Sequence, residues 1–159
     1  MSEGAVVLPD VAATEALGRA LGALLRAGDV VALFGDLGTG KTSLARGALA
    51  ALGLAGEAPS PTFAIVQPYA PPEVALPVAH VDLYRLDAPG DADELGLDEM
   101  LDDGALLIEW PERLGDALWR HAIRLTLAPD AGGGRRLTWI APAAWEARWP
   151  PLLPPASPR

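Results

Sequence analysis

Residues 35–42 read Gly35-Asp36-Leu37-Gly38-Thr39-Gly40-Lys41-Thr42, and this stretch decides the fold of the 159-residue chain. Its pattern, G-x-x-x-x-G-K-T, is that of the loop with which nucleotide-hydrolysing proteins bind phosphate. Of the 12 lysines and arginines in the chain, only Lys41 is a lysine. An ammonium is a compact point charge, whereas a guanidinium is a planar fork that does not replace it in such a loop. The sequence therefore predicts that Lys41 contacts phosphate groups.

The segments on either side of this loop are those that a phosphate-binding loop requires. Residues 30–34 form a short apolar run, which is typical of a buried parallel strand. Residues 43–52 have a helical pattern and are followed by Gly53, as helices often are. Strand, glycine loop and helix together would surround phosphate oxygens with backbone N–H groups, and the Thr42 hydroxyl would bind Mg²⁺. A chance glycine turn is the alternative, and the flanking elements disfavour it.

The composition of the chain limits its class. Half of the residues (50%) are hydrophobic, so we expect one folded domain over residues 1–149 and a loosely held proline-rich tail over residues 150–159. The absence of cysteine excludes disulfides, thiolate zinc sites and a cysteine nucleophile. The net charge of −9 argues against a broad nucleic-acid surface. Without a membrane-length apolar run or a basic signal segment, we expect a cytoplasmic protein.

The remaining pattern predicts an α/β fold with further strands. We expect a first helix that Asp10 or Thr14 caps and that runs through Ala27. Pro68 indicates that its strand lies at a sheet edge, and this strand and the next are expected to pair antiparallel. A glycine-rich turn at residues 130–134 predicts a hairpin. The expected strands cover residues 63–69, 78–83, 105–108, 123–127 and 137–140, and a short acidic helix covers residues 91–101.

Three side chains are candidates for the chemistry of hydrolysis, which needs a carboxylate near the metal and a group that orients water. Glu109 follows a predicted strand at its carboxyl end, where open α/β sheets bind ligands; the alternative is a surface glutamate. Asp82 lies in an apolar strand and could serve Mg²⁺ or the attacking water, or else pair with Arg85 or face solvent. Thr62 lies where a switch loop would offer its hydroxyl, although a Ser-Pro-Thr stretch is more often a turn.

Four further residues allow a structural or a functional interpretation. Trp110 follows Glu109 and could pack on a nucleotide, although a lone tryptophan is by default part of the core. His80 is expected to be structural, because no second histidine has the spacing of a metal ligand. Arg135 and Arg136 follow the predicted turn and could reach phosphates, although solvated arginines are more common at such positions.

Four segments, in their order and spacing, resemble the TsaE (YjeE) family. They are residues 35–42, Ser60-Pro61-Thr62-Phe63, His80-Val81-Asp82-Leu83-Tyr84-Arg85-Leu86 and Ile108-Glu109-Trp110-Pro111-Glu112. The acidic segment 94–99 also fits, whereas Val81 stands where the family commonly has phenylalanine. The resemblance runs from the first helix to the last hairpin. It implies a compact three-layer α/β fold of the P-loop NTPase type, with a mixed parallel and antiparallel sheet.

The resemblance also implies a function. The family is the ATPase component of bacterial tRNA threonylcarbamoyladenosine (position 37) synthesis and acts with the TsaB and TsaD proteins. ATP and Mg²⁺ are therefore the implied cofactors, and tRNA is reached through the partner complex. The implied catalytic residues are Lys41, Asp82 and Thr62, and the implied metal ligands are Thr42 and Glu109. The implied nucleotide-binding residues are Thr14, Asp36, Leu37, Gly38, Thr39, Gly40, Lys41, Thr42, Ser43, Trp110 and Arg135.

The sequence also bears on other classes of protein that contain a phosphate-binding loop. We expect a Mg²⁺-dependent ATPase that is slow alone, because no arginine is placed as a ready finger, and that its partner complex stimulates. A small-molecule P-loop kinase is the alternative, although no lid-sized insertion is evident. A GTP-binding switch is excluded, because its Asn-Lys-x-Asp motif needs an asparagine and a second lysine, which the chain lacks. The intact set of Lys41, Thr42, Asp82 and Glu109 disfavours a nucleotide-free interaction module.

Overall fold

The computed structural model describes residues 1–56, 58 and 65–151, and in them seven strands form one mixed sheet. The strand order is β1-β7-β6-β2-β5-β4-β3. Neighbours among β6, β2, β5 and β4 are parallel, whereas β1, β7 and β3 run antiparallel to the strands beside them. The expected mixed sheet and the edge position of Pro68 are thereby confirmed. The bounds are β1 Ser2–Leu8, β2 Val30–Phe34, β3 Val66–Tyr69, β4 Val78–Asp82, β5 Ala105–Glu109, β6 Ile123–Pro129 and β7 Arg135–Ala141.

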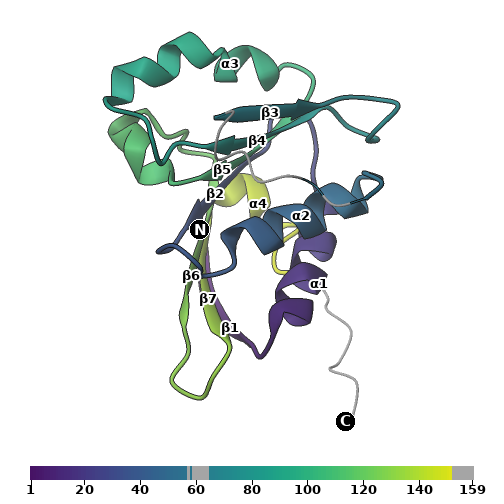
Figure 1. Cartoon of the computed structure of the whole chain (residues 1–159), viewed down its shortest axis with the longest axis vertical. Coiled ribbons are helices and arrows are strands. Elements are labelled where there is room, and N and C mark those ends of the chain that lie inside the picture. Colours follow the sequence, from purple (N-terminus) through teal and green to yellow (C-terminus); the bar gives the residue numbers. More distant parts are fainter. Residues whose placement is uncertain (57, 59–64, 152–159) are drawn as a thin grey trace.

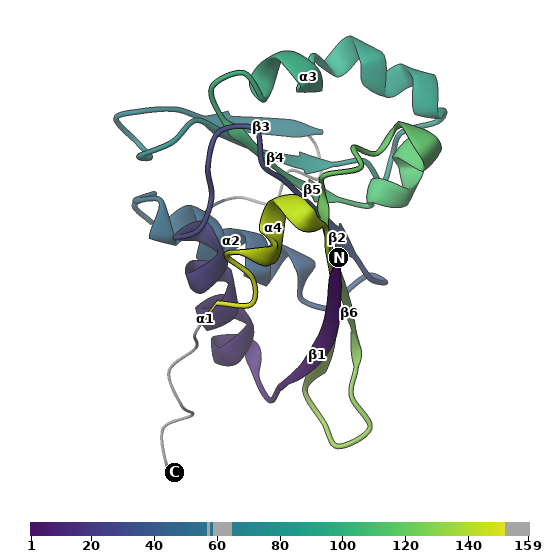
Figure 2. The same ribbon diagram turned by 180° about the vertical axis from the view of Figure 1, so that it is seen from behind.

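Helices cover both faces of the sheet and give the molecule three layers (Figures 1 and 2). The helices α1, α2 and α4 share one apolar cluster with the sheet, and α3 with the 3₁₀ helices η1 and η2 shares a second cluster with the opposite face. In the described part of the chain, no helix is long and apolar enough to cross a membrane. The bounds are α1 Val11–Gly22, α2 Lys41–Ala51, η1 Pro89–Leu95, α3 Leu97–Met100, η2 Pro111–Ala117 and α4 Ala143–Glu146.

The two central strands explain where the glycine loop lies. Every residue of β5 is buried, and in β2 only Phe34 is partly exposed. Strands with this pattern are covered by helices on both sides, which leaves their ends as the accessible part. The carboxyl ends of β2 and β5 lie side by side, because Leu33 pairs with Glu109. The loop that follows β2 and the side chain of Glu109 therefore meet at one edge of the sheet.

Glycines allow α1 and α2 to pack closely. At Gly18, Gly22 and Gly47, an added Cβ would lie 2.2–2.4 Å from a backbone carbonyl oxygen of the opposite helix. Because backbone atoms cannot turn aside as a side chain can, any larger residue at these positions would push the two helices apart. This contact fixes the start of α1 relative to the glycine loop that opens α2.

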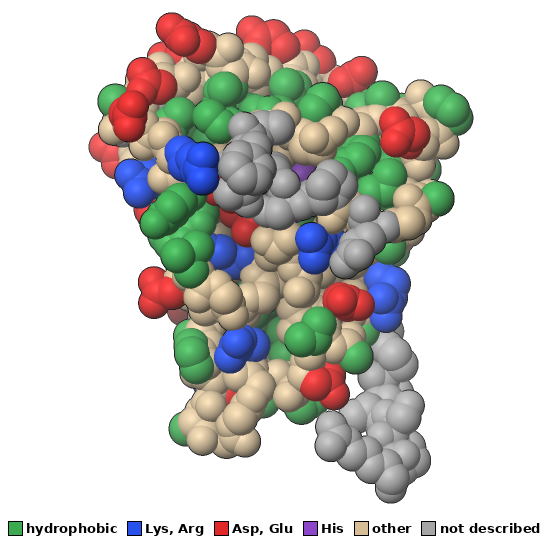
Figure 3. Space-filling view, viewed as in Figure 1, with side chains coloured by type: hydrophobic (Ala, Val, Ile, Leu, Met, Phe, Trp, Pro, Cys, Tyr) green, Lys and Arg blue, Asp and Glu red, His purple; other side chains and the backbone are tan. Residues whose placement is uncertain are grey.

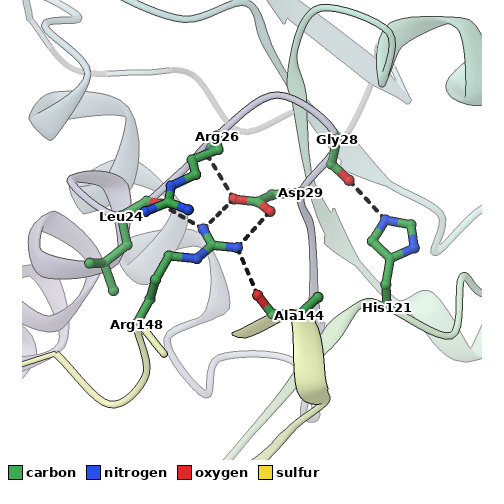
Figure 4. A network of polar contacts seen from close by, with 7 residues as sticks. All are labelled: Leu24, Arg26, Gly28, Asp29, His121, Ala144 and Arg148. Carbon is green, nitrogen blue, oxygen red and sulfur yellow. Dashed lines mark hydrogen bonds and ion pairs between the residues drawn. The ribbon is translucent and has the colours of Figure 1, made fainter. Parts of the chain in front are cut away.

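A buried ion pair ties α4 to the start of β2, at the end of that strand away from the glycine loop (Figure 4). The Arg148 guanidinium donates to both carboxylate oxygens of Asp29, at 2.7 and 3.0 Å, and to the carbonyl oxygens of Leu24 and Ala144. Each of the two charged side chains is only 9% exposed. The bidentate hydrogen bonds and the additional carbonyl partners of Arg148 replace the interactions with water that both charges lose on burial.

The first part of the chain differs from the sequence analysis in two ways. No strand was predicted before the first helix, yet Ser2–Leu8 forms β1, in which Val6 and Leu8 face the core and Val7 is exposed. The first helix ends at Gly22 rather than Ala27. The residues that follow it turn tightly, and Asp29 accepts a hydrogen bond from the backbone of Arg26 at 2.7 Å.

Two later elements also differ from those predicted from the sequence. The acidic helix expected at residues 91–101 is instead η1 followed by α3, because Gly96 between them has a φ of 70°, which interrupts a helix. In the described part of the expected strand 63–69, residues 66–69 form β3. Thr62 and the tail residues 152–159 lie outside the described residues.

Candidate functional site

A cavity of about 510 Å³ opens at the carboxyl edge of the parallel strands. Its walls come from the start of α1, the glycine loop with the start of α2, the ends of β4 and β5, and the β6–β7 turn. A volume of about 300–1,000 Å³ is typical of small-molecule sites. The lining residues are Asp10, Val11, Thr14, Leu37, Gly38, Thr39, Gly40, Lys41, Thr42, Ser43, Asp82, Glu109, Trp110, Gly134 and Arg135.

The glycine loop has a conformation that only glycine adopts without strain. Gly35, Gly38 and Gly40 have φ angles of 142°, 76° and 105°. A Cβ at Gly35 would also lie 2.6 Å from the Leu127 carbonyl oxygen. Gly40 is the N-cap of α2 and provides no side-chain cap hydrogen bond. No capping side chain of that residue therefore competes with an anion for the first N–H groups of α2.

Side chains brace the loop from two sides. The Thr39 hydroxyl donates to the Asp36 carbonyl oxygen at 2.8 Å. The Arg135 guanidinium, which comes from β7, donates to the carbonyl oxygens of Gly38 at 2.9 Å and Gly134 at 3.3 Å. Arg135 thus links the hairpin to the loop across the cavity wall. Asp36 differs from the other expected nucleotide-binding residues that are described, because it does not line the cavity.

Lys41 lies almost buried at the base of the cavity, with 5% of its surface exposed. Its ammonium donates to the Gly35 carbonyl oxygen and lies 3.7 Å from the centroid of the Trp110 ring. Burial lowers the pKa of Lys41 below its ordinary value, and nearby carboxylates, Glu109 foremost, oppose this shift. Trp110 has a φ of 59°, rare for a non-glycine residue, and its ring lies 4.9 Å from that of Tyr84.

Thr42 and Glu109 are in direct contact. The Thr42 hydroxyl lies 3.0 and 3.1 Å from the two carboxylate oxygens of Glu109. Glu109 is 3% exposed, and its Oε2 also lies 2.6 Å from Nε2 of the fully buried His80. A hydroxyl and a carboxylate are oxygen ligands of the kind that Mg²⁺ prefers, so this pair fits a magnesium ion at the edge of the cavity.

Asp82 lines the same cavity at the end of β4. The parallel register pairs it with Glu109, so the two carboxylates belong to the last residues of neighbouring strands. Its Oδ1 accepts a hydrogen bond from the backbone N–H of Tyr84 at 2.9 Å, which fixes the side chain. Asp82 is partly buried rather than fully exposed.

Thr14, near the start of α1, lines the cavity next to the glycine loop. Thr14 is 2% exposed in α1 and its hydroxyl donates to the Asp10 carbonyl oxygen at 3.4 Å, while Asp10 itself caps the helix. Sequence reasoning missed Asp10, Val11 and Gly134 as lining residues, although they neighbour Thr14 and Arg135 in the sequence. It also missed the contact between His80 and Glu109, which only the register of β4 and β5 reveals.

Known proteins resemble this chain over the segments that form the site. The family model described as "Threonylcarbamoyl adenosine biosynthesis protein TsaE" matches residues 8–137, which include the loop, Asp82, Glu109 and the β6–β7 turn. The chain belongs to the TsaE family. The resemblance inferred from the four segments is thereby confirmed.

Individual TsaE relatives match over most of their length. The tRNA threonylcarbamoyladenosine biosynthesis protein TsaE of Mycobacterium tuberculosis (strain ATCC 25618 / H37Rv) is 38% identical over 144 residues, which cover 86% of each chain. The protein of the same name from Streptomyces coelicolor is 43% identical over 117 residues, 73% of this chain and 79% of the relative. The crystal structure of Bacillus subtilis YdiB matches with a TM-score of 0.74 and 28% identity, covering 88% of this chain and 86% of YdiB.

Proposed function

We propose that this TsaE-family chain binds and hydrolyses ATP during tRNA threonylcarbamoyladenosine formation, together with the TsaB and TsaD proteins. The contact between Thr42 and the buried Glu109 carboxylate, beside the glycine loop, carries the proposal. ATP hydrolysis needs phosphate binding and a metal site in the same place, and the residues suited to both line one cavity. The biosynthetic setting rests on the names of the relatives.

The glycine loop and Lys41 are proposed to hold the phosphates of ATP. The uncapped N-terminus of α2 favours an anion through its N–H groups and its dipole. The Lys41 ammonium would exchange the Gly35 carbonyl for phosphate oxygens and would stay beside the Trp110 ring. Because burial already disfavours the charged lysine, an anion beside it replaces the hydration that the side chain has lost.

Thr42 and Glu109 are proposed to hold Mg²⁺, which when bound neutralises charge that develops on the phosphates. Asp82 is proposed to orient the attacking water, because it lines the cavity beside Glu109 and a backbone hydrogen bond holds it in place. For Thr62 the support is the family resemblance, which assigns it to a switch-like loop.

The part of the cavity wall formed by the start of α1 and Leu37 is proposed to bind the nucleoside part of ATP. Thr14 and the exposed side chains of Val11 (63%) and Leu37 (70%) line that wall, and apolar surface suits a base. Trp110 and Arg135 border the cavity on other sides. Arg135 is proposed to contact the nucleotide. Its guanidinium donates to loop carbonyl oxygens and is therefore not free to stabilise the transition state as an arginine finger would. We therefore propose slow hydrolysis by the chain alone.

Surface charge supports a partner that carries the tRNA. Acidic side chains gather over η1 and α3, along the upper edge of Figure 3. Together with the net charge of −9, this surface would repel a phosphate backbone. The exposed acidic residues there are Asp91, Asp93, Glu94, Asp98, Glu99, Asp102 and Asp103. We propose that TsaB and TsaD hold the tRNA and that this chain acts on their complex.

Binding of a non-hydrolysable ATP analogue, with and without Mg²⁺, tests the nucleotide site. We expect Mg²⁺ to increase affinity, Lys41→Ala to abolish binding, and Arg124→Ala, which removes an exposed cation outside the cavity, to bind as the wild type does. Unchanged binding by Lys41→Ala would refute the site. Screening small-molecule acceptors tests the kinase alternative, which predicts phosphoryl transfer in place of free phosphate release.

A further inference from the structure

His80 is a buried histidine whose side chain contacts the candidate metal site rather than a neighbouring backbone. It is 0% exposed in β4, where it pairs with Leu107 of β5. Side chains alternate along a strand, so His80 and Asp82 share the face on which Leu107 and Glu109 lie. The imidazole therefore lies beneath the Glu109 carboxylate, on the side of the sheet that α2 covers.

The contact with Glu109 indicates that Nε2 of the His80 ring carries a proton. Nε2 lies 2.6 Å from Oε2 of Glu109, and an ionised carboxylate can only accept, so Nε2 donates. Within the described part of the chain, the buried Nδ1 has no hydrogen-bond partner. Among the described residues, the contact with Glu109 is thus the only hydrogen bond of this ring. A packing role alone would be served as well by an apolar side chain, which would bury no unsatisfied nitrogen.

His121, the other histidine of the chain, makes a different contact. It is partly exposed, and its Nε2 lies 2.8 Å from the Gly28 carbonyl oxygen (Figure 4). Gly28 precedes β2, at the end of the strand away from the glycine loop. His121 therefore anchors a loop, whereas His80 anchors a functional carboxylate.

We propose that His80 is a positioning residue that orients Glu109 for a divalent cation. This inference rests on the proposed function, because it assumes that Glu109 binds metal. Glu109 receives hydrogen bonds from His80 and from Thr42, which belong to two separate elements, β4 and α2. With two donors on separate elements, the carboxylate keeps one orientation before a cation arrives. Hydrogen bonds of this kind to metal ligands contribute about 10- to 100-fold in metal affinity or activity.

Metal-dependent nucleotide binding by His80→Leu tests the proposal. A fluorescent non-hydrolysable ATP analogue is titrated with Mg²⁺, and the half-maximal concentration is compared among variants. We expect His80→Leu to need about 10- to 100-fold more Mg²⁺, with wild-type affinity for the analogue in EDTA. His80→Gln, whose amide nitrogen can donate to Glu109, should recover most of the loss. The matched control His121→Leu removes the other imidazole and should keep the wild-type Mg²⁺ requirement.

A second measurement requires neither nucleotide nor metal. Nitrogen-15 NMR of the apoprotein, assigned with His121→Leu, reports which ring nitrogen of His80 is protonated, and we expect Nε2. A proton on Nδ1, or equal Mg²⁺ requirements in His80→Leu and His121→Leu, would overturn the inference. Failure of the wild type to bind the analogue with Mg²⁺ would instead overturn the proposed function, so the two failures are distinguishable.

Discussion

Gly47→Ala should separate α1 from α2 and thereby disturb the nucleotide site from a distance. The new Cβ would lie 2.3 Å from the Glu15 carbonyl oxygen and 3.0 Å from the Arg19 backbone nitrogen. Ordinary contact begins at 3.4 Å, so the helices must move apart by about 1 Å. Overpacking costs about 1–3 kcal/mol, which the higher helix propensity of alanine offsets by about 1 kcal/mol.

We therefore expect Gly47→Ala to lower the free energy of unfolding by up to about 2 kcal/mol, or Tm by up to about 8 °C. The start of α1 and the glycine loop line neighbouring parts of the cavity, since a Cβ at Gly40 would lie 3.5 Å from the Thr14 methyl group. A misplacement of about 1 Å can cost up to about 100-fold in activity, so nucleotide affinity should fall by about tenfold or more.

Thermal unfolding and analogue titration check both effects. Gly132→Ala is the matched control, because its Cβ would meet only the mobile end of Asp130, at 3.3 Å. We expect that control to stay within about 0.5 kcal/mol of the wild type. If Gly47→Ala unfolds and binds as Gly132→Ala does, then the close contact does not position the site.

Three further variants test individual side chains. Lys41→Met should abolish analogue binding. It should also raise the Tm of the apoprotein, because it removes a buried charge that destabilises the folded state, as the lowered pKa of Lys41 indicates. Since the unfolded state holds the Lys41 proton more tightly, the difference in Tm between the variant and the wild type should shrink as pH rises from the lowered pKa towards 10.5. Equal Tm values throughout would contradict this. Arg148→Met should cost about 3–5 kcal/mol in denaturant unfolding, because Asp29 would be left charged and buried; the double variant with Asp29→Asn should recover part of that loss, and no recovery would exclude the pair. Trp110→Gly should raise the analogue Kd by loss of the ring beside Lys41 while relieving a φ of 59°; an unchanged Kd would remove Trp110 from the site.

Local signals were sufficient to predict the centre of the fold. The strand, loop and helix around Lys41 are contiguous in sequence, and each has its own pattern, so β2 and α2 could be predicted together. Glu109 could be placed because it follows a short apolar strand, and the register of β2 and β5 puts it beside the loop. The turn at residues 130–134 predicted the hairpin of β6 and β7, since its glycines suit such a turn.

Features that depend on distant contacts could not be predicted. The Trp139 ring covers Gly4 in β1, where a Cβ would lie 2.2 Å from it, and a glycine within an edge strand weakens the sequence pattern. The contact of His80 with Glu109 joins residues 29 positions apart and needs the register of two parallel strands. Val11 was missed because its side chain reaches the cavity only when α1 is packed on α2.

ATP hydrolysis by the purified chain, with and without the TsaB–TsaD complex and substrate tRNA, tests the central claim most directly. We predict slow turnover by the chain alone, faster turnover with the complex, and repeated tRNA modification that Lys41→Ala prevents. Turnover that the complex and tRNA leave unchanged would contradict the proposed function and would favour a small-molecule kinase.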